Sequence, residues 1–353
     1  MAPETMKAWT HSRAGLPSKV LTLDTLPVLA VTTPTQVRVK ISHCALNPGP
    51  SIVMQLLPFV FRASKAIPEM DFSGAIVELG SNVPVERNLA VGTEVFGSMP
   101  IGQHVKKTSG ALAEYIVVDC DAVVKKPGGQ SLEQVAGLGV AGCTALDLIK
   151  AAKLKTGDSV LVNGASGGIG HLVLQMCRAK VGETGKVVAI CSSSNVGWVK
   201  ELGADEVVDY KERSPIQSYL AGAYDLSRFN AVIDAAGIQA IFNHCPDYLA
   251  EGKPYVTVGP RQPNYTVLGM ISTIGLMAKN FLWPRILGGV PRPYVQVAAA
   301  ETLDGLQELA QMVEDGKLKV HVGAKYKMAE ALQAYDRMLS GHAQGKIVVE
   351  MGE

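Results

Sequence analysis

The sequence predicts an α/β protein with two parts: a unit of short β segments, then a doubly wound parallel sheet with helices on both faces. Short apolar or alternating segments separated by proline and glycine fill roughly the first 125 residues. From about residue 130 onward, strands alternate with helices. Apolar residues make up 47% of the 353 residues and charged residues 18%, so the chain can bury a sizeable core.

The first part consists of short strand-like segments. Residues 36–42 (QVRVKIS) alternate between apolar and polar side chains, as expected for a strand with one buried face. Apolar segments at 72–80, 92–97 and 113–119 repeat this theme between turns. We therefore predict an all-β, barrel-like domain over residues 1–126.

The second part begins with a helical pattern at 132–152, followed by a strand at 158–163, a glycine turn and a helix at 171–180. A further helix is expected at 196–204, and further short apolar strands at 186–191, 206–210, 230–237 and 254–259. Strands that alternate with helices form a parallel sheet covered on both faces. We predict this second domain over residues 127–299.

The C-terminal residues 300–353 are assigned to the first domain and not to the second. Helices are expected at 300–316 and 329–341, and a last strand at 345–350. We expect residues 300–353 to pack back on the first domain and complete it.

Charge and cysteine usage exclude several classes of protein. Lys and Arg total 33 against 32 acidic residues, so no net field attracts nucleic acid or an anionic membrane. Six cysteines are scattered without a C-x-x-C pair, which favours reduced thiols in an intracellular protein. The uncharged runs at 41–61 and 262–278 are broken by prolines or too short to cross a bilayer, and no signal peptide is recognisable. These features predict a soluble, cytoplasmic protein.

The stretch NGASGGIG at 163–170 lies between a predicted strand and a predicted helix. The first N–H groups of a helix lack internal partners, and glycines let the backbone approach a diphosphate closely. A glycine turn alone can reflect only a need for positive φ, but the strand–turn–helix context favours a phosphate site. The residues expected to hold the diphosphate are Ala165, Ser166, Gly167, Gly168 and Ile169.

The end of the next strand indicates which dinucleotide is bound. A site for NAD needs a carboxylate there for the ribose 2′-hydroxyl, whereas this chain has Ser192, Ser193, Ser194 and Asn195. These side chains can donate to a 2′-phosphate, and Lys200 and Tyr210 lie near enough in sequence to add a cation and a phenol. The alternative is that the serines merely end a strand and cap a helix. We predict NADPH as the cofactor.

Several motifs together resemble the zinc-independent quinone oxidoreductase and enoyl reductase branch of the medium-chain dehydrogenase/reductase superfamily, including its fungal-type members. These motifs are ALNPGP (45–50), DFSGAIVELGSNV (71–83), GALAEYIVV (110–118), AGCTALDLI (141–149), the glycine turn, LGADEVVDYKE (202–212), VIDAAG (232–237) and GKIVVE (345–350). The resemblance implies a GroES-like catalytic domain, a Rossmann domain and NADPH bound between them.

The resemblance also bears on metal binding. Relatives with zinc hold it with a Cys, a His and a second Cys, and the matching positions here are Asn47, Met70 and Val140. These side chains are not zinc ligands, and the four-cysteine structural zinc lobe is missing. We therefore expect no metal.

Hydride transfer to an activated acceptor remains possible without a metal. The resemblance places Asn47 and Thr144 at the nicotinamide end of the site, with Val258 and Gly259 beside it, and adds Lys346 to the cofactor contacts. Asn47 is predicted to be catalytic, donating a hydrogen bond to the substrate oxygen. That Asn47 only orders its own loop stays open as the alternative.

Two apolar segments, 52–61 and 266–294, are candidates for the walls of a pocket for a bulky apolar substrate. Ordinary core, a dimer contact or a membrane-surface patch would explain them equally well. Part of the second segment also resembles sequences of fungal lipid-droplet-associated members.

The predicted function is an NADPH-dependent reductase of enones, enoyl compounds or quinones, acting on an apolar substrate of the secondary-metabolite type. Two alternatives stay open: a trans-acting enoyl reductase that partners a polyketide synthase, and a non-catalytic NADPH-binding protein. A homodimer is possible.

Overall fold

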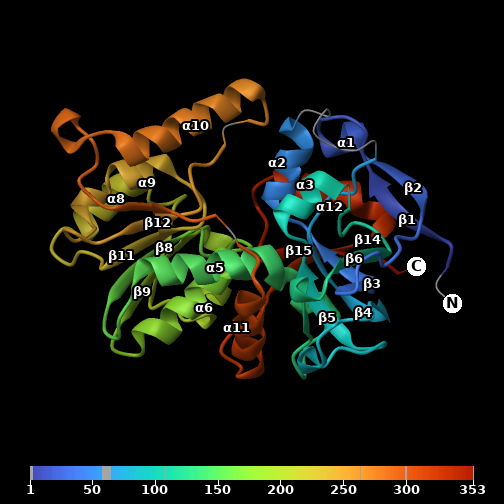
Figure 1. Ribbon diagram of the computed structural model, residues 1–353. Coiled ribbons are helices and arrows are strands. Elements are labelled where there is room, and N and C mark those ends of the chain that lie inside the picture. The colour runs from blue at the N-terminus through green and yellow to red at the C-terminus, as the bar shows by residue number, and fades with distance from the viewer. Residues whose placement is uncertain (1–2, 58–64, 108, 263, 299, 353) are drawn as a thin grey trace. The chain divides into compact units, whose positions relative to one another are not determined.

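The computed structural model describes residues 3–57, 65–107, 109–262, 264–298 and 300–352 (Figure 1). The chain forms two compact units, one of residues 1–143 with 300–353 and one of residues 144–299. The first break lies later than the boundary predicted at 126, because the segment after residue 130 packs on the sheet of the first unit. There the Ser73 hydroxyl donates to the Leu132 carbonyl over 2.6 Å.

The first unit is built on a seven-stranded sheet in which the strand order is β14-β15-β3-β4-β5-β7, with β6 paired to β3. Its strands are β3 (Gln36–Ala45), β4 (Asp71–Leu79), β5 (Glu94–Ser98), β6 (Tyr115–Asp119), β7 (Val123–Lys125), β14 (Val322–Lys327) and β15 (Lys346–Glu350). The C-terminal strand β15 pairs antiparallel with β3, so the tail of the chain contributes to this unit.

The remaining elements of the first unit surround this sheet. They are β1 (Thr5–Thr10), β2 (Thr22–Pro27), α1 (Pro17–Val20), α2 (Pro48–Leu56), α3 (Ile101–Lys107), α4 (Leu132–Val135), α11 (Leu303–Glu314) and α12 (Ala331–Leu339), with 3₁₀ turns η2 (Val85–Arg87), η3 (Cys120–Ala122), η4 (Ala136–Leu138) and η8 (Met328–Glu330). Buried side chains of β3, β4 and α12 share one hydrophobic core.

The second unit contains a six-stranded parallel sheet with the order β10-β9-β8-β11-β12-β13. The strands are β8 (Ser159–Asn163), β9 (Lys186–Cys191), β10 (Glu206–Asp209), β11 (Ala231–Asp234), β12 (Tyr255–Thr257) and β13 (Tyr294–Gln296). Because the chain runs outward from β8 in both directions, the sheet is doubly wound. The predicted fold class, a β unit followed by a doubly wound parallel sheet, is confirmed.

Helices cover both faces of the parallel sheet, with α5 and α6 on one side and α8 and α9 on the other, and α10 lies beyond α9 (Figure 1). Their bounds are α5 (Gly139–Ala152), α6 (Gly170–Val181), α7 (Val196–Glu201), α8 (Ile216–Ala223), α9 (Gln239–Asn243) and α10 (Val267–Leu282), with 3₁₀ turns η5 (Ser193–Asn195), η6 (Cys245–Asp247) and η7 (Arg285–Leu287).

Two expectations from the sequence differ from the structure. The single helix expected at 132–152 is divided into α4, η4 and α5. The backbone leaves the helical conformation at Gly139, where ψ is −96° and a Cβ atom would lie 2.2 Å from Oδ1 of Asp71. Helix α10 was not predicted, since apolar residues on more than one of its faces hide the helical period.

One helical stretch in the described part of the chain, Leu132–Ala152, is long and apolar enough to cross a membrane. In the most apolar part of this stretch, 78% is buried inside the protein, as is usual for a core helix.

Candidate functional site

The glycine turn connects β8 to α6 at the carboxyl edge of the parallel sheet, which is the edge at which its strands end. The turn is closed by a hydrogen bond of 2.9 Å from the Gly167 N–H to the Gly164 carbonyl. All five residues predicted to hold a diphosphate, 165–169, lie between this strand and this helix.

Glycine is required at two positions of this turn. Gly164 has a φ of +72°, in the left-handed region that side chains with a Cβ rarely adopt. A Cβ atom at Gly170 would lie 2.0 Å from the Gly164 carbonyl oxygen. The backbone therefore crosses itself closely just before the N-terminus of a twelve-residue helix, as a diphosphate-binding turn requires. A dinucleotide fits this geometry.

The polar residues after β9 form a connected group beside the turn. The Asn195 amide donates to the hydroxyl of Ser166 over 2.9 Å and to that of Ser192 over 3.1 Å. The Ser192 and Ser194 hydroxyls lie 3.2 Å apart. The structure thus brings the two sequence-predicted parts of the cofactor site together, although contacts with a cofactor stay a prediction.

The two outer members of the predicted 2′-phosphate group lie at the surface. Lys200 is exposed near the end of α7, and Tyr210 is 40% exposed directly after β10. The sequence analysis missed Asp209, the last residue of β10, whose pKa is lowered chiefly by a hydrogen bond from Ser193. This carboxylate disfavours a phosphate beside the serines.

Asp234 orders the loop that follows β11. Its carboxylate accepts hydrogen bonds from the Asn163 amide (2.7 Å) and the Tyr255 hydroxyl (2.6 Å). Backbone N–H groups of 236–238 also donate to it, over 2.7 to 3.0 Å. Because Asp234 is buried, this network fixes the carboxyl ends of β8 and β11 relative to each other and to Tyr255, the first residue of β12.

The other cofactor contacts predicted in this unit lie close to that loop or on α5. The Val258 N–H donates to the Asp234 carbonyl over 3.3 Å, and Gly259 adopts a φ of +97° directly after it. Thr144 is buried on α5. Each of these three roles stays a prediction.

In the first unit, Asn47 lies in a buried polar cluster. Its side-chain N–H groups donate to the Asp71 carboxylate over 2.8 Å and to the Ala45 carbonyl over 3.3 Å. Its side-chain oxygen accepts from the Lys346 ammonium over 2.7 Å. Both amide hydrogens thus have acceptors within the protein, and the catalytic role of Asn47 stays a prediction.

Lys346 is the first residue of β15 and is only 3% exposed. Besides Asn47, its ammonium donates to the Leu46 carbonyl over 3.2 Å and lies 3.9 Å from the Asp71 carboxylate. Burial lowers the pKa of Lys346 and raises that of Asp71. The ammonium group is therefore directed at the loop of Asn47, and the predicted contact between Lys346 and the cofactor stays untested.

Glu69 forms the other side of this cluster. Its carboxyl group accepts from the Asn47 backbone N–H (3.0 Å) and from the Tyr335 hydroxyl (2.7 Å). Complete burial raises the pKa of Glu69 from 4.5 to about 8, although both hydrogen bonds oppose that change. The residue also has a φ of +67°, an unfavourable conformation for a side chain with a Cβ.

Two of the three positions that the resemblance assigned to zinc ligands donate hydrogen bonds to Asp71. Asn47 bonds to one carboxylate oxygen, and the Val140 N–H donates to the other over 2.8 Å. Met70 precedes Asp71 in the chain and is buried. The donor set offers an amide, a thioether and an aliphatic side chain, which does not suit zinc.

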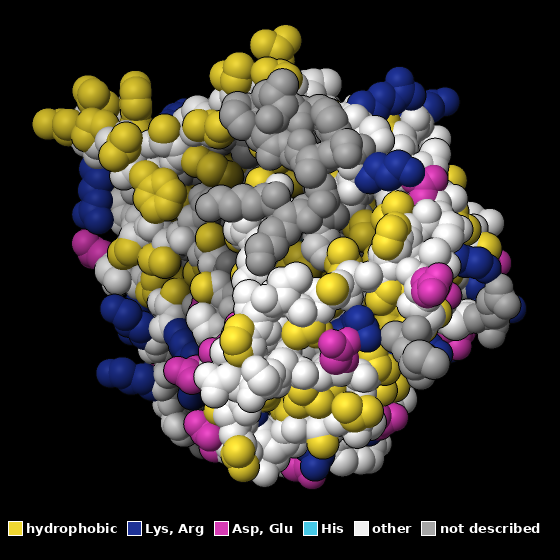
Figure 2. All heavy atoms as spheres, turned by 45° about the vertical axis from the view of Figure 1, so that its right-hand side comes forward, with side chains coloured by type: hydrophobic (Ala, Val, Ile, Leu, Met, Phe, Trp, Pro, Cys, Tyr) yellow, Lys and Arg dark blue, Asp and Glu magenta, His cyan; other side chains and the backbone are white. Residues whose placement is uncertain are grey.

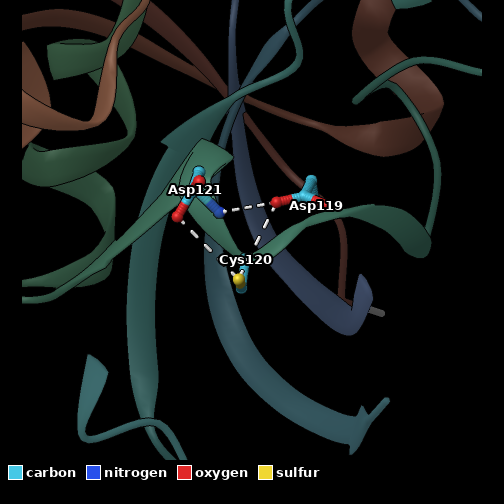
Figure 3. A group of neighbouring side chains, drawn as sticks. All are labelled: Asp119, Cys120 and Asp121. Carbon is cyan, nitrogen blue, oxygen red and sulfur yellow. Dashed lines mark hydrogen bonds between the residues drawn. The ribbon is translucent and has the colours of Figure 1, made fainter. Parts of the chain in front are cut away.

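Within the described ranges, the one group of three potential metal ligands lies elsewhere, at Asp119, Cys120 and Asp121 (Figure 3). Asp119 accepts hydrogen bonds from the Asp121 N–H over 3.1 Å and from the Thr35 hydroxyl over 2.6 Å. Arg87 lies 3.6 Å from Asp121. These contacts are those of a capped turn, so we assign no metal to the group.

Sequence reasoning missed Glu69, Asp71, Asp209, Asp234 and Tyr335. A signal was present for Asp71 and Asp234, since Asp71 begins a mainly apolar strand and Asp234 ends an otherwise apolar one. Such residues are buried only when they are hydrogen-bonded, which points to a polar network. No comparable signal distinguishes Tyr335 from the other apolar-face residues of its helix.

A doubly wound parallel sheet with a glycine turn at its carboxyl edge, joined to a separate β unit, defines a dinucleotide-binding protein of two domains. Residues 33–128 match the family model of the alcohol dehydrogenase GroES-like domain. Residues 202–349 match that of the zinc-binding dehydrogenase.

Individual relatives agree with these matches. The chain is 32% identical to the trans-enoyl reductase poxH of Penicillium oxalicum, over 99% of this chain and 98% of that protein. It is 31% identical to the medium chain reductase pydE of Acremonium sp, over 98% and 99%. The quinone oxidoreductase of Coxiella burnetii has a similar structure, with a TM-score of 0.79 and 27% identity over 99% of this chain and all of that one.

The chain therefore belongs to the medium-chain dehydrogenase/reductase superfamily, as its motifs indicated. It is an oxidoreductase of a family that uses a nicotinamide dinucleotide.

Proposed function

We propose that this protein is an NADPH-dependent reductase that delivers a hydride to a quinone or to the activated C=C bond of an enone or enoyl compound. The observation that carries the proposal is the glycine turn joined to Ser192 and Asn195, in a chain whose relatives are named enoyl and quinone reductases. An apolar acceptor is favoured because many large apolar side chains remain exposed on the second unit.

The residues of the turn, 165–169, would hold the diphosphate, and 192–195 the phosphorylated ribose. When bound, reduced nicotinamide supplies the hydride. The loop after β11 and the Val258–Gly259 segment are the proposed support of the nicotinamide end, because they follow strands on the other side of β8.

Asn47 is the proposed hydrogen-bond donor to the acceptor oxygen. Of the two hydrogen bonds that its side chain donates, the one to the Ala45 carbonyl is longer, at 3.3 Å, and is therefore the weaker bond to exchange for a substrate. The Lys346 ammonium on the Asn47 carbonyl draws electron density from the amide and makes its N–H a better donor. Lys346 also stays our candidate for a cofactor contact, together with Thr144.

The test is oxidation of NADPH, followed by its absorbance, against a panel of quinones, enones and enoyl thioesters. We expect turnover with at least one activated acceptor and with no saturated ketone. Binding of NADPH without turnover of any acceptor would favour a non-catalytic role, and absence of both would refute the proposal.

Cofactor choice is tested by Ser193→Asp. A carboxylate at this position repels a 2′-phosphate and accepts from a 2′-hydroxyl, so the ratio of Kd for NADH to that for NADPH should fall by about tenfold or more. The matched variant Asp209→Asn should change the ratio in the opposite direction. An unchanged ratio in both variants would place the ribose elsewhere.

A trans-acting enoyl reductase that serves a polyketide synthase is the second candidate, supported by relatives named as trans-enoyl reductases. It differs in one expectation: only thioester or carrier-bound enoyl substrates should turn over. A homodimer, a cytoplasmic location and an association with lipid droplets or membrane surfaces stay predictions.

A further inference from the structure

Gln296 ends β13 at the same edge of the parallel sheet as the loops of the proposed cofactor site. In the parallel pairing of β12 with β13, Gln296 is the partner of Thr257, and the Val297 N–H donates to the Thr257 carbonyl over 2.9 Å. Thr257 and Gln296 are the last residues of their strands. The Gln296 side chain therefore begins at the carboxyl edge, beside the segment that follows β12.

The amide group of Gln296 lies against Gly259. A Cβ atom at Gly259 would be 2.7 Å from Nε2 and 3.3 Å from Oε1 of Gln296. Gly259 has a φ of +97°, and its N–H donates to the Thr257 hydroxyl over 3.1 Å. Glycine is thus needed here both for its backbone conformation and for the space that the amide occupies. Because Gly259 belongs to the proposed support of the nicotinamide, the Gln296 amide lies at that support.

The Gln296 amide has weak hydrogen-bond partners. Its Nε2 donates to the Met277 sulfur over 3.6 Å, and a thioether is a weak acceptor. Its Oε1 accepts from the Tyr294 hydroxyl over 3.3 Å, which is long for a bond between two oxygens. Within the part of the chain that the structure describes, the Gln296 side chain makes these two bonds and no stronger one.

Another amide pair at the same edge shows what well-matched partners look like. Gln239 and Asn280 exchange two hydrogen bonds of 2.9 Å, because each amide offers one donor and one acceptor to the other. The longer contacts of Gln296 leave the same two positions poorly filled. Exchanging them for a second amide would therefore cost little and would gain two good bonds.

The surroundings of Gln296 give its amide little other use. Apolar side chains make up most of α10, the helix that contains Met277. Hydrophobic side chains project at the upper edge of Figure 2, where Figure 1 places this helix. A partly buried amide beside such groups is unfavourable unless it is well bonded. The position thus favours a polar partner that the chain itself does not supply.

We infer that Gln296 binds the carboxamide group of the nicotinamide, accepting from its NH₂ group through Oε1 and donating to its carbonyl through Nε2. The inference rests on the proposed function and adds to it the residue that recognises the nicotinamide ring. On that ring, the carboxamide alone offers a donor and an acceptor side by side. Two bonds to it would also fix which face of the ring is turned toward the acceptor.

The test compares NADP⁺ with its 3-acetylpyridine analogue, in which a methyl group replaces the carboxamide NH₂. Binding is measured by calorimetry on the full chain without an acceptor. We expect the unaltered chain to bind NADP⁺ about fivefold or more tightly than the analogue, because the analogue lacks one bond. Gln296→Met, which is similar in length but makes neither bond, should reduce this preference to within about twofold by weakening NADP⁺. Equal binding of the two dinucleotides by the unaltered chain would overturn the inference.

Two control variants separate a contact with the cofactor from a structural role. Met277→Leu removes the sulfur that competes for the Gln296 amide, and Gln239→Met removes the well-bonded amide of the same edge. Both should keep the preference for NADP⁺. If Met277→Leu abolished the preference as fully as Gln296→Met, Gln296 would act by holding α10, and the assigned contact would be wrong.

A further variant tests the other glutamine that follows β12. The Nε2 of Gln262 is buried and has no hydrogen-bond partner among the described residues. Loss of the preference in Gln262→Met, together with its retention in Gln296→Met, would assign the carboxamide to Gln262 and overturn the inference.

The outcomes also distinguish this inference from the proposed function. If NAD⁺ binds more tightly than NADP⁺, NAD⁺ and its own 3-acetylpyridine analogue provide the same comparison. Failure of both NADP⁺ and NAD⁺ to bind would refute the proposed function. Binding of either one without a preference over its analogue would refute only the role of Gln296.

Discussion

The two candidate regions of this protein are assembled in different ways. The carboxyl edge of the second unit is built from loops that directly follow strands, and its glycine turn is closed by bonds between near neighbours such as Gly164 and Gly167. The polar cluster of the first unit joins residues far apart in sequence, such as Asn47 and Lys346, which are separated by 299 positions. The glycine turn can be predicted from the sequence because its residues are close together in the chain. The polar cluster cannot, because its residues meet only when the sheet is complete.

The regions also differ in what their polar groups bond to. In the cluster, Asn47, Asp71, Glu69 and Lys346 are buried and bonded to one another, so each depends on the others. In the loops after β9, the serines are partly exposed and remain able to bond a ligand. We expect changes in the cluster to act mainly on stability and changes in the loops mainly on cofactor binding.

The largest expected effect is that of Lys346→Met. It leaves the Asp71 carboxylate without its cation in a buried site, and should lower the free energy of unfolding by about 3–5 kcal/mol. Equilibrium unfolding in urea measures this. Lys346→Arg, which keeps the charge, should recover part of the loss.

The matched control is Lys325→Met, which removes an exposed cation 3.1 Å from Glu133 and 3.3 Å from Glu350. This change should lower the free energy of unfolding by less than about 1 kcal/mol. If the two methionine variants were equally stable, the cluster would not hold the first unit together as described.

An intermediate effect is expected for Gly170→Ala in the glycine turn. The added Cβ would lie 2.0 Å from the Gly164 carbonyl, so the turn must open, and Kd for NADPH should rise by about tenfold or more. Fluorescence titration measures the affinity. Gly197→Ala, on α7 where a Cβ meets nothing within 4 Å, should bind NADPH normally.

The last expected effect concerns pH. The folded-state pKa of Glu69, about 8, lies above its ordinary value of 4.5. Its contribution to stability is therefore present in full below about pH 4.5 and is lost as pH rises through 8. The slope should not exceed about 1.4 kcal/mol per pH unit. Glu69→Gln should make the free energy of unfolding depend less on pH. Urea unfolding between pH 5 and about pH 8 measures this, and an equal slope in the variant and the unaltered chain would exclude Glu69 as the source of the pH dependence.

Much of the fold was predictable because strands and helices alternate in the second unit with clear periods. Predictions failed where tertiary contacts decide the local structure. The helical stretch at 132–152 is irregular at Gly139, where the backbone lies close to Asp71, and β13 is only three residues long and is a strand through its pairing with β12.

In the candidate site, too, contacts between residues close in sequence were predictable, and contacts between distant elements were not. Ser166, Ser192 and Asn195 could be assigned together from spacing alone, and the structure connects them. The partners of Asn47 could not be found from the sequence, because Lys346 and Tyr335 lie on a distant strand and helix. Asp209 was missed because its closeness to Ser193 arises from the pairing of β10 with β9.

The position of Lys346 has a consequence for the newly synthesised chain. The loop of Asn47 leaves the ribosome early, but its lysine partner is synthesised 299 residues later, after the whole of the second unit. Until Lys346 emerges, Asp71 and Glu69 must therefore remain hydrated or protonated in an incomplete sheet. A nascent chain stalled before Lys346 would contain a finished second unit and a first unit that cannot yet close.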